Sequence, residues 1–129
     1  MCGGIGRVKL GVVLGLVLVL NGCVLLPSQS DPNQNERFVD LVIAAQQLDC
    51  EQSVREQAVH MHGLTNWILV HAEFSGWRNR DVIDIAQPIG ETVEGLIENH
   101  HNQFYCEIVR EQLIDQTQAA AGAMLRRMR

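Results

Sequence analysis

The segment from Phe38 to Cys50, FVDLVIAAQQLDC, decides the fold class of this chain. Five of its apolar residues follow the spacing i, i+3, i+4, i+7 and i+10, and they are Phe38, Leu41, Val42, Ala45 and Leu48. In a helix with 3.6 residues per turn this spacing gathers them on one face. The pattern predicts a helix from about residue 35 to residue 49, with Cys50 just beyond its end.

A second helical region follows Cys50. Ser53 and Glu56 form the Ser-x-x-Glu pattern of a capping box, which predicts a new helix start after the cysteine. The residues just before Ser53 are also good helix formers, so a helix that continues from Cys50 to Gly63 stays open. We expect the region to end at residues 75–76, and its apolar face to hold Val59, Leu64, Trp67, Ile68, His71 and Phe74.

Two further helices complete the predicted fold. Pro88 has no N–H donor, so it should end or kink a short helical piece that starts near residue 82, and it can equally begin the next helix. Polar residues 99–102 then lead to the last helix. The expected faces are Ile89, Val93, Leu96 and Ile97 in the third helix, and Phe104, Ile108, Val109, Leu113 and Gln116 in the fourth. No window alternates apolar and polar residues over a strand's length, so we predict an all-α four-helix bundle over residues 36–129.

The first 22 residues read as a secretory signal peptide. The apolar run from Leu10 to Leu20 has eleven residues, whereas a membrane-spanning helix needs about 20. Arg7 and Lys9 precede this run without any acidic residue, as in the positive start of a signal peptide. A buried core helix is the alternative, and the polar residues that follow the run argue against it.

The end of this signal resembles the lipobox of bacterial lipoproteins. Leu20-Asn21-Gly22-Cys23 places Leu three residues before Cys and a small residue directly before it, although Asn21 departs from the usual residue and leaves the extent of processing open. The resemblance implies cleavage between Gly22 and Cys23, and acylation of Cys23. Val24 follows instead of the Asp that marks inner-membrane retention, so the expected location is the periplasmic face of the outer membrane. Residues 23–35 would be the lipidated N-terminus and a flexible polar spacer.

The chain that remains after this cut is acidic. It holds eight arginines, no lysine and fifteen Asp and Glu residues, a balance of −7. Such a chain is repelled by phosphate, so we expect no nucleic-acid partner, and attachment to the membrane through the lipid anchor and not through a basic patch. The arginines at positions 126, 127 and 129 read as a solvated helix end.

Cys50 and Cys106 are the two cysteines inside the predicted bundle. Outside the cytoplasm an even pair predicts a disulfide, and two free buried thiols are the alternative. No CxxC pair occurs, which argues against redox catalysis and a structural zinc site.

We expect no metal, no cofactor and no enzymatic activity. The histidines, at positions 60, 62, 71, 100 and 101, lack the i, i+4 spacing of a chelating pair. His60 and His71 share a helix face but stand three turns apart, so a metal-binding bundle is the weakest of three classes. Glu91, Glu94 and Glu98 form one solvated helix face, and the chain has no nucleophile motif.

Together these features resemble the type II secretion pilotins of the PulS/OutS type. That family combines a lipobox, a polar spacer and a small helical domain with two cysteines and a Gly-Trp between them. The family motif is similar to A-x-x-x-Gly-Trp-Asp, and Ala72 to Arg78 reads AEFSGWR here, with Arg78 at the Asp position. Trp77 is expected to pin the corner between two helices.

The resemblance implies a chaperone. A pilotin binds the disordered C-terminal segment of a secretin subunit, which folds into a helix on a groove of the pilotin, and the lipoprotein sorting machinery carries both to the outer membrane. The groove candidates can equally be core residues, and they are Trp67, Ile68, Ile89, Val93 and Leu96. The competing class is an unrelated envelope or conjugation-associated surface lipoprotein that acts as a structural module.

Overall fold

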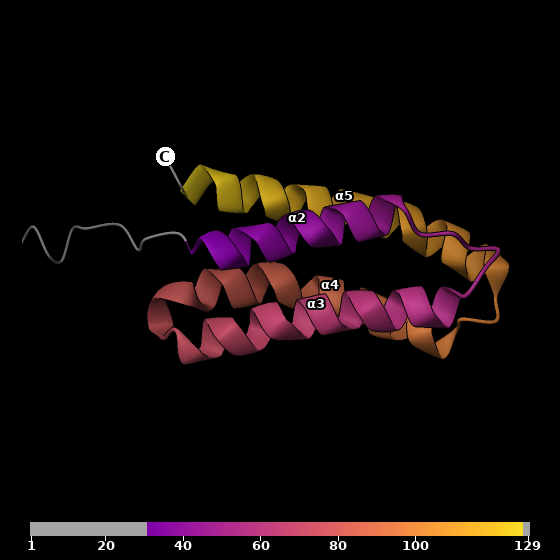
Figure 1. The fold of residues 1–129 in the computed structure, drawn as a ribbon, viewed down its shortest axis with the longest axis horizontal. Coiled ribbons are helices and arrows are strands. Elements are labelled where there is room, and N and C mark those ends of the chain that lie inside the picture. The colour runs from indigo at the N-terminus through magenta and orange to yellow at the C-terminus, as the bar shows by residue number, and fades with distance from the viewer. Residues whose placement is uncertain (1–30, 128–129) are drawn as a thin grey trace, which may run out of the picture.

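The computed structural model describes residues 31–127, and within this range it contains four α-helices, one 3-10 turn and no strand. The elements are α2 (Pro32–Gln46), α3 (Val54–Phe74), η1 (Trp77–Asn79), α4 (Arg80–Glu98) and α5 (Gln103–Arg127). Consecutive helices run antiparallel, with α2 beside α5 and α3 beside α4 (Figure 1). The predicted all-α four-helix bundle is confirmed. The predicted signal peptide, the predicted cleavage site between Gly22 and Cys23 and the predicted lipidation of Cys23 lie outside the described residues.

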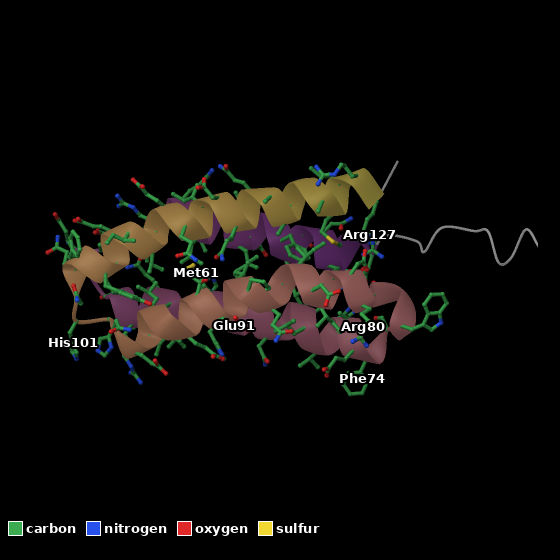
Figure 2. All side chains as sticks on the ribbon, turned by 180° about the vertical axis from the view of Figure 1, so that it is seen from behind. Met61, Phe74, Arg80, Glu91, His101 and Arg127 are labelled. Carbon is green, nitrogen blue, oxygen red and sulfur yellow. A yellow bond between two sulfur atoms is a disulfide. The ribbon has the colours of Figure 1, made fainter. Side chains whose placement is uncertain are left out.

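All four helices contribute to one core along the centre of the bundle. The stripe predicted on α2 is confirmed, since Phe38, Leu41 and Ala45 are fully buried. Met61 of α3 points into the space between the helices (Figure 2). Other large side chains that are buried here are Ile68, Ile89, Leu96, Leu113 and Met124. A chain of this size therefore encloses one continuous hydrophobic core.

The first helix begins earlier than the sequence pattern suggested. Asp31 is its N-cap, with Oδ1 accepting a hydrogen bond of 2.9 Å from the N–H of Asn33, and Pro32 is the first helical residue. Asp followed by Pro is a favoured helix start, so the flexible spacer predicted up to residue 35 is wrong for residues 32–35. Gln34 is 1% exposed, which shows that the core already includes this first turn.

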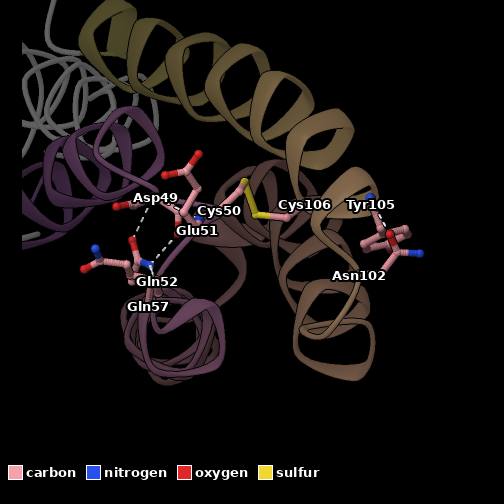
Figure 3. Close-up of a disulfide and its surroundings, with 8 residues drawn as sticks. All are labelled: Asp49, Cys50, Glu51, Gln52, Gln57, Asn102, Tyr105 and Cys106. Atoms are coloured by element: carbon pink, nitrogen blue, oxygen red, sulfur yellow. Dashed lines mark hydrogen bonds between the residues drawn. A yellow bond between two sulfur atoms is a disulfide. The ribbon is translucent and has the colours of Figure 1, made fainter.

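The chain breaks between α2 and α3, and the break that the sequence left open runs over residues 47–53. The predicted start of a new helix at Ser53 is confirmed, but the capping box is wrong, because Ser53 adopts a left-handed conformation with φ 49° and its side chain makes no cap hydrogen bond. Gln57 holds the loop instead (Figure 3). Its Oε1 accepts from the N–H of Asp49 at 2.9 Å, and its Nε2 donates to the carbonyls of Asp49 and Gln52.

Helix α3 runs without a break through Gly63 and ends at Phe74, next to the end expected at residues 75–76. Inside this helix the Oγ1 of Thr65 donates a hydrogen bond of 2.8 Å to the carbonyl of Met61. The predicted apolar face is partly wrong: Val59, Trp67 and Phe74 are 48%, 36% and 89% exposed. The buried face instead holds Val54, Ala58, Met61, Leu64, Thr65, Ile68 and Ala72.

Pro88 neither ends α4 nor begins a new helix, because α4 runs unbroken from Arg80 to Glu98 with Pro88 inside it. Pro88 has no N–H, so the carbonyl of Asp84, four positions earlier, receives no helix hydrogen bond from residue 88. Both Pro88 and Asp84 are exposed, so water can hydrate the freed carbonyl. The predicted helix end or new helix start at Pro88 is therefore wrong.

The predicted loop over residues 99–102 is confirmed, and α5 begins at Gln103. Asn102 accepts a hydrogen bond of 3.0 Å from the N–H of Tyr105 at this start. On the predicted face of α5, Val109 and Leu113 are buried, Gln116 is half-buried, but Phe104 and Ile108 are 71% and 54% exposed.

The predicted disulfide is confirmed. Cys50 and Cys106 are joined with an S–S distance of 2.13 Å and a Cα–Cα distance of 5.7 Å (Figure 3). The bond fastens the α2–α3 loop to the first turn of α5, so it closes the end of the bundle at which α2 ends and α5 begins.

The opposite end of the bundle gathers the start of α2, the α3–α4 turn and the end of α5. His71 Nε2 of α3 lies 3.0 Å from Asp31 Oδ2 before α2, and Arg127 Nε of α5 lies 3.3 Å from Asp81 Oδ2 of α4. Figure 2 shows Phe74 and Arg127 toward this end and His101 at the other. Trp77 is 82% exposed, so the expectation that its indole pins the corner between two helices is wrong.

Replacing Gly76 by alanine is expected to lower the free energy of unfolding by about 1–3 kcal/mol. Gly76 has φ 89° and ψ −174°, a region that only glycine adopts without strain. An added Cβ meets no atom within 4 Å, so the cost comes from the backbone alone. Urea denaturation followed by circular dichroism measures it.

Gly63→Ala is the matched control for Gly76→Ala. An added Cβ at Gly63 also meets nothing within 4 Å, but this residue lies inside α3. Alanine should therefore raise the free energy of unfolding by about 0.5–1 kcal/mol. Effects of the same sign at both positions would contradict the backbone explanation.

Candidate docking groove between α2 and α3

An open groove follows the seam between α2 and α3. Helix α3 packs most extensively against α4 and less against α2, which leaves this seam hollow. Two hollows of about 650 and 280 Å³ lie along it, and a third of about 490 Å³, lined by α3 residues alone, continues from them on the outer face of α3. The first and second share Arg37, His60 and Leu64, and the second and third share Gly63 and Trp67. The hollows therefore form one groove, which runs from Ser53 to Phe74.

The largest hollow lies nearest the disulfide end. Its walls combine apolar side chains with polar ones at the rim, and they are Arg37, Asp40, Ile43, Ala44, Gln47, Ser53, Glu56, Gln57, His60 and Leu64. Ile43 is 44% exposed although it is a large apolar residue. Asp40 comes from α2 and Glu56 from α3, so each helix places one carboxylate at the rim.

A row of aromatic and charged side chains bridges α2 and α3 beside the groove. The guanidinium carbon of Arg37 lies 5.4 Å from the centroid of the Trp67 ring, within cation–π range. Trp67 stacks on His71 with ring centroids 4.7 Å apart and planes 15° from parallel. His71 reaches Asp31 at the start of α2, and Arg37 Nη1 lies 3.3 Å from Asp40 Oδ2. These contacts fix the orientation of Trp67 in the groove wall.

The middle of the groove is open because Gly63 stands there. This residue lines both the second and the third hollow, and a side chain at its position would point into empty space. Beyond it, the third hollow is walled by Val70 and Phe74, which are 42% and 89% exposed. The groove thus presents apolar surface over the whole length of α3.

Such a shape suits an amphipathic helix. A long, shallow, apolar groove between two helices with polar residues along its rim is a common mode by which proteins bind helical peptides. Within residues 31–127, no three His, Cys, Asp or Glu side chains gather in a way that could hold a metal ion. None of the helices in this range is long and apolar enough to cross a bilayer.

Four of the five residues predicted for the groove belong to the core. Ile68, Ile89, Val93 and Leu96 are at most 1% exposed, and Ile89 lines a separate small hollow between α4 and α5. Trp67 alone of the five lines the groove. The wall residues that the sequence reasoning missed are Arg37, Ile43, His60, Gly63, Val70 and Phe74. One signal was available: Ile43 and Val70 are large apolar residues that lie off the buried stripes of their helices.

No protein-family model, curated protein or solved structure matches this chain.

Proposed function

We propose that the protein is a lipid-anchored docking protein of the pilotin type. In this proposal the α2–α3 groove binds the C-terminal segment of a secretin subunit as an amphipathic helix. The acylated Cys23 and the lipoprotein sorting machinery then bring the pair to the outer membrane for type II protein secretion. The observation that carries the proposal is the continuous apolar groove from Ser53 to Phe74.

The exposed apolar residues of the groove support a protein partner. Ile43, Val59 and Val70 are each more than 40% exposed, and they come from the two helices that form the walls. Burying such side chains stabilises a complex by about 25 cal/mol for each Å² of apolar surface removed from water. The rim carboxylates Asp40 and Glu56 favour a peptide with basic residues beside its apolar face.

A peptide titration tests the proposal. The oxidised domain of residues 30–129, first shown to be folded, receives the C-terminal peptide of a secretin from the same cell, while Trp67 emission and far-UV circular dichroism are recorded. A Trp77→Phe variant removes the second indole. Saturable binding with a gain of helix is the expected result. No binding at high micromolar peptide would favour the unrelated envelope lipoprotein.

Blocking the groove at its centre is expected to weaken peptide binding about tenfold or more. In the Gly63→Leu variant a side chain occupies the space that a bound helix would fill, and such overpacking costs roughly 1–3 kcal/mol. The free domain should become slightly more stable, since glycine inside a helix is unfavourable. Fluorescence titration and urea denaturation of the same variant separate the two effects.

Gly122→Leu is the matched control. Gly122 lies in α5, away from the groove, and an added Cβ would meet only Arg126 Nη1, at an ordinary contact distance of 3.6 Å. This variant should gain stability and bind the peptide like the unsubstituted domain. Equal binding by the Gly63→Leu and Gly122→Leu variants would show that the peptide does not use the groove.

A further inference from the structure

Two aromatic side chains project from the end of the bundle at which α2 begins. Phe74 and Trp77 are 89% and 82% exposed, the highest values for large apolar side chains among residues 31–127. They flank the turn at Ser75 and Gly76, between α3 and α4. Leu125 of the last turn of α5 adds a third exposed apolar side chain, 56% exposed. Single exposed apolar residues need no explanation, but the two most exposed aromatic side chains of residues 31–127 lie within four residues of each other at this end.

This end, which we call the tethered end, comprises residues 31–34, 71–82 and 124–127. The contact between His71 Nε2 and Asp31 Oδ2 and the ion pair between Arg127 and Asp81 link its three segments, and Figure 2 shows Phe74, Arg80 and Arg127 toward the same end of the bundle. Phe74 ends α3, Trp77 follows in η1, and the exposed arginines Arg80 and Arg126 come from α4 and α5. These exposed aromatic and basic residues therefore lie at one end of the bundle although they are far apart in sequence.

The charge of the molecule is divided unevenly. The tethered end holds four of the seven arginines of residues 31–127 but three of the fifteen acidic residues. Its own balance is +1, and that of the remaining described residues is −9. The tethered end is thus the part of an acidic domain that an anionic surface repels least. The net charge of the whole chain argued against a basic patch, because it averages over this local difference in charge.

The covalent chain leads from the same end toward the proposed lipid anchor. Eight peptide units join Cys23 to Asp31, so their Cα atoms can be at most about 29 Å apart by any path. Helix α3 alone has 21 residues and is about 32 Å long. An acylated Cys23 would therefore hold Asp31 within about 29 Å of the bilayer surface, so the tethered end is the end of the bundle that the anchor brings toward the membrane.

We infer that the tethered end docks on a bilayer surface with anionic headgroups, with Phe74 and Trp77 inserted at the headgroup level. This inference rests on the lipid anchor of the proposed function, and its test uses no secretin peptide, although Phe74 also lines the last hollow of the groove. Aromatic rings are favoured at the membrane–water interface because one part of the ring system is apolar and another is polar. The docking contact itself can be weak, because the anchor gives it a high effective concentration.

Quenching by brominated lipids tests the docked end. The full chain, expressed with its signal and purified from membranes, is reconstituted into phosphatidylglycerol-containing vesicles with and without bromine on the acyl chains. In a Trp67→Phe background, Trp77 emission is expected to fall in the brominated vesicles. The control places the single indole at the opposite end, in a Trp67→Phe, Trp77→Ser, Phe104→Trp variant, whose emission should not change. Phe104 is suitable because it is 71% exposed in the first turn of α5.

Two arginine pairs test the charge. Arg80→Gln with Arg126→Gln removes two charges from the tethered end and should weaken the quenching of Trp77. Arg55→Gln with Arg110→Gln removes the same charge elsewhere and should not. Equal effects of the two pairs would contradict a local role of the basic residues.

Vesicle flotation separates failure of the anchor from failure of the docking. A chain that does not float with the vesicles would contradict both the lipid anchor and this inference. If the chain floats but Trp77 is quenched no more than the indole of the Phe104→Trp variant, the anchor stands and the docked end is wrong.

Discussion

Replacing both Cys50 and Cys106 by alanine is expected to lower the free energy of unfolding by about 4 kcal/mol. The two residues are 56 positions apart, and a cross-link over such a loop removes this much chain entropy from the unfolded state on the chain-entropy model. Domains of this size have a total stability of about 5–15 kcal/mol, so the double variant should be close to unfolding at physiological temperature. Urea denaturation of the oxidised and the variant domain measures the difference.

Reduction of the unsubstituted domain provides the control for this prediction. A reducing agent should destabilise the unsubstituted domain by a similar amount and leave the double-alanine variant unchanged, because no second disulfide can form within residues 31–127. A change below about 1 kcal/mol in the variant would mean that the unfolded chain is already compact around these two positions.

Phe38→Ala is expected to lower the free energy of unfolding by about 3–5 kcal/mol. Phe38 is fully buried on α2 and is one of the largest side chains inside the bundle. Removing its ring loses buried apolar surface and leaves a cavity. The surrounding helices can relax into this cavity only in part. Thermal and urea denaturation of the oxidised domain would record the loss.

The neighbouring residue supplies the control. Val39 lies next to Phe38 on α2 but is 47% exposed, so Val39→Ala should change the stability by no more than about 0.5 kcal/mol. Similar losses in both variants would mean that α2 packs on the bundle with a different face.

The sequence was most informative where one stripe of a helix is apolar and the rest is polar. On α2 the spacing of Phe38, Leu41 and Ala45 predicted the buried face correctly, and the cysteine pair predicted the disulfide. The helix order and the loop before α5 also followed from the polar residues between the stripes. These features depend on local spacing, which a single sequence records directly.

The buried face of α3 could not be read in the same way. This helix carries apolar residues nearly all round, so periodicity alone does not select a face. The prediction placed bulky residues such as Trp67 and Phe74 on the buried face, but the buried positions include the small residues Ala58 and Ala72. Small residues permit a close approach of helices, and whether an alanine is used for this purpose depends on the partner helix.

The residues that line the candidate groove could not be predicted from the sequence for a related reason. A groove is the space left where two helices pack less closely, and it is a property of their arrangement and not of either helix alone. The predicted residues Ile89, Val93 and Leu96 form the regular stripe of α4, which is the pattern of a core. Proline at position 88 misled the prediction because its consequence depends on whether water can reach the freed carbonyl.

The continuity of the α2–α3 groove also sets a length. Its walls extend over the whole of α3, which has 21 residues, or about 32 Å at 1.5 Å per residue. A guest helix that filled the groove from end to end would need about 20 residues, whereas one of half that length would leave either the Ile43 hollow or the Phe74 hollow open to water. The length of the groove therefore selects the length of the bound helix. In a series of progressively shortened peptides, affinity should fall each time the peptide no longer covers one of the hollows.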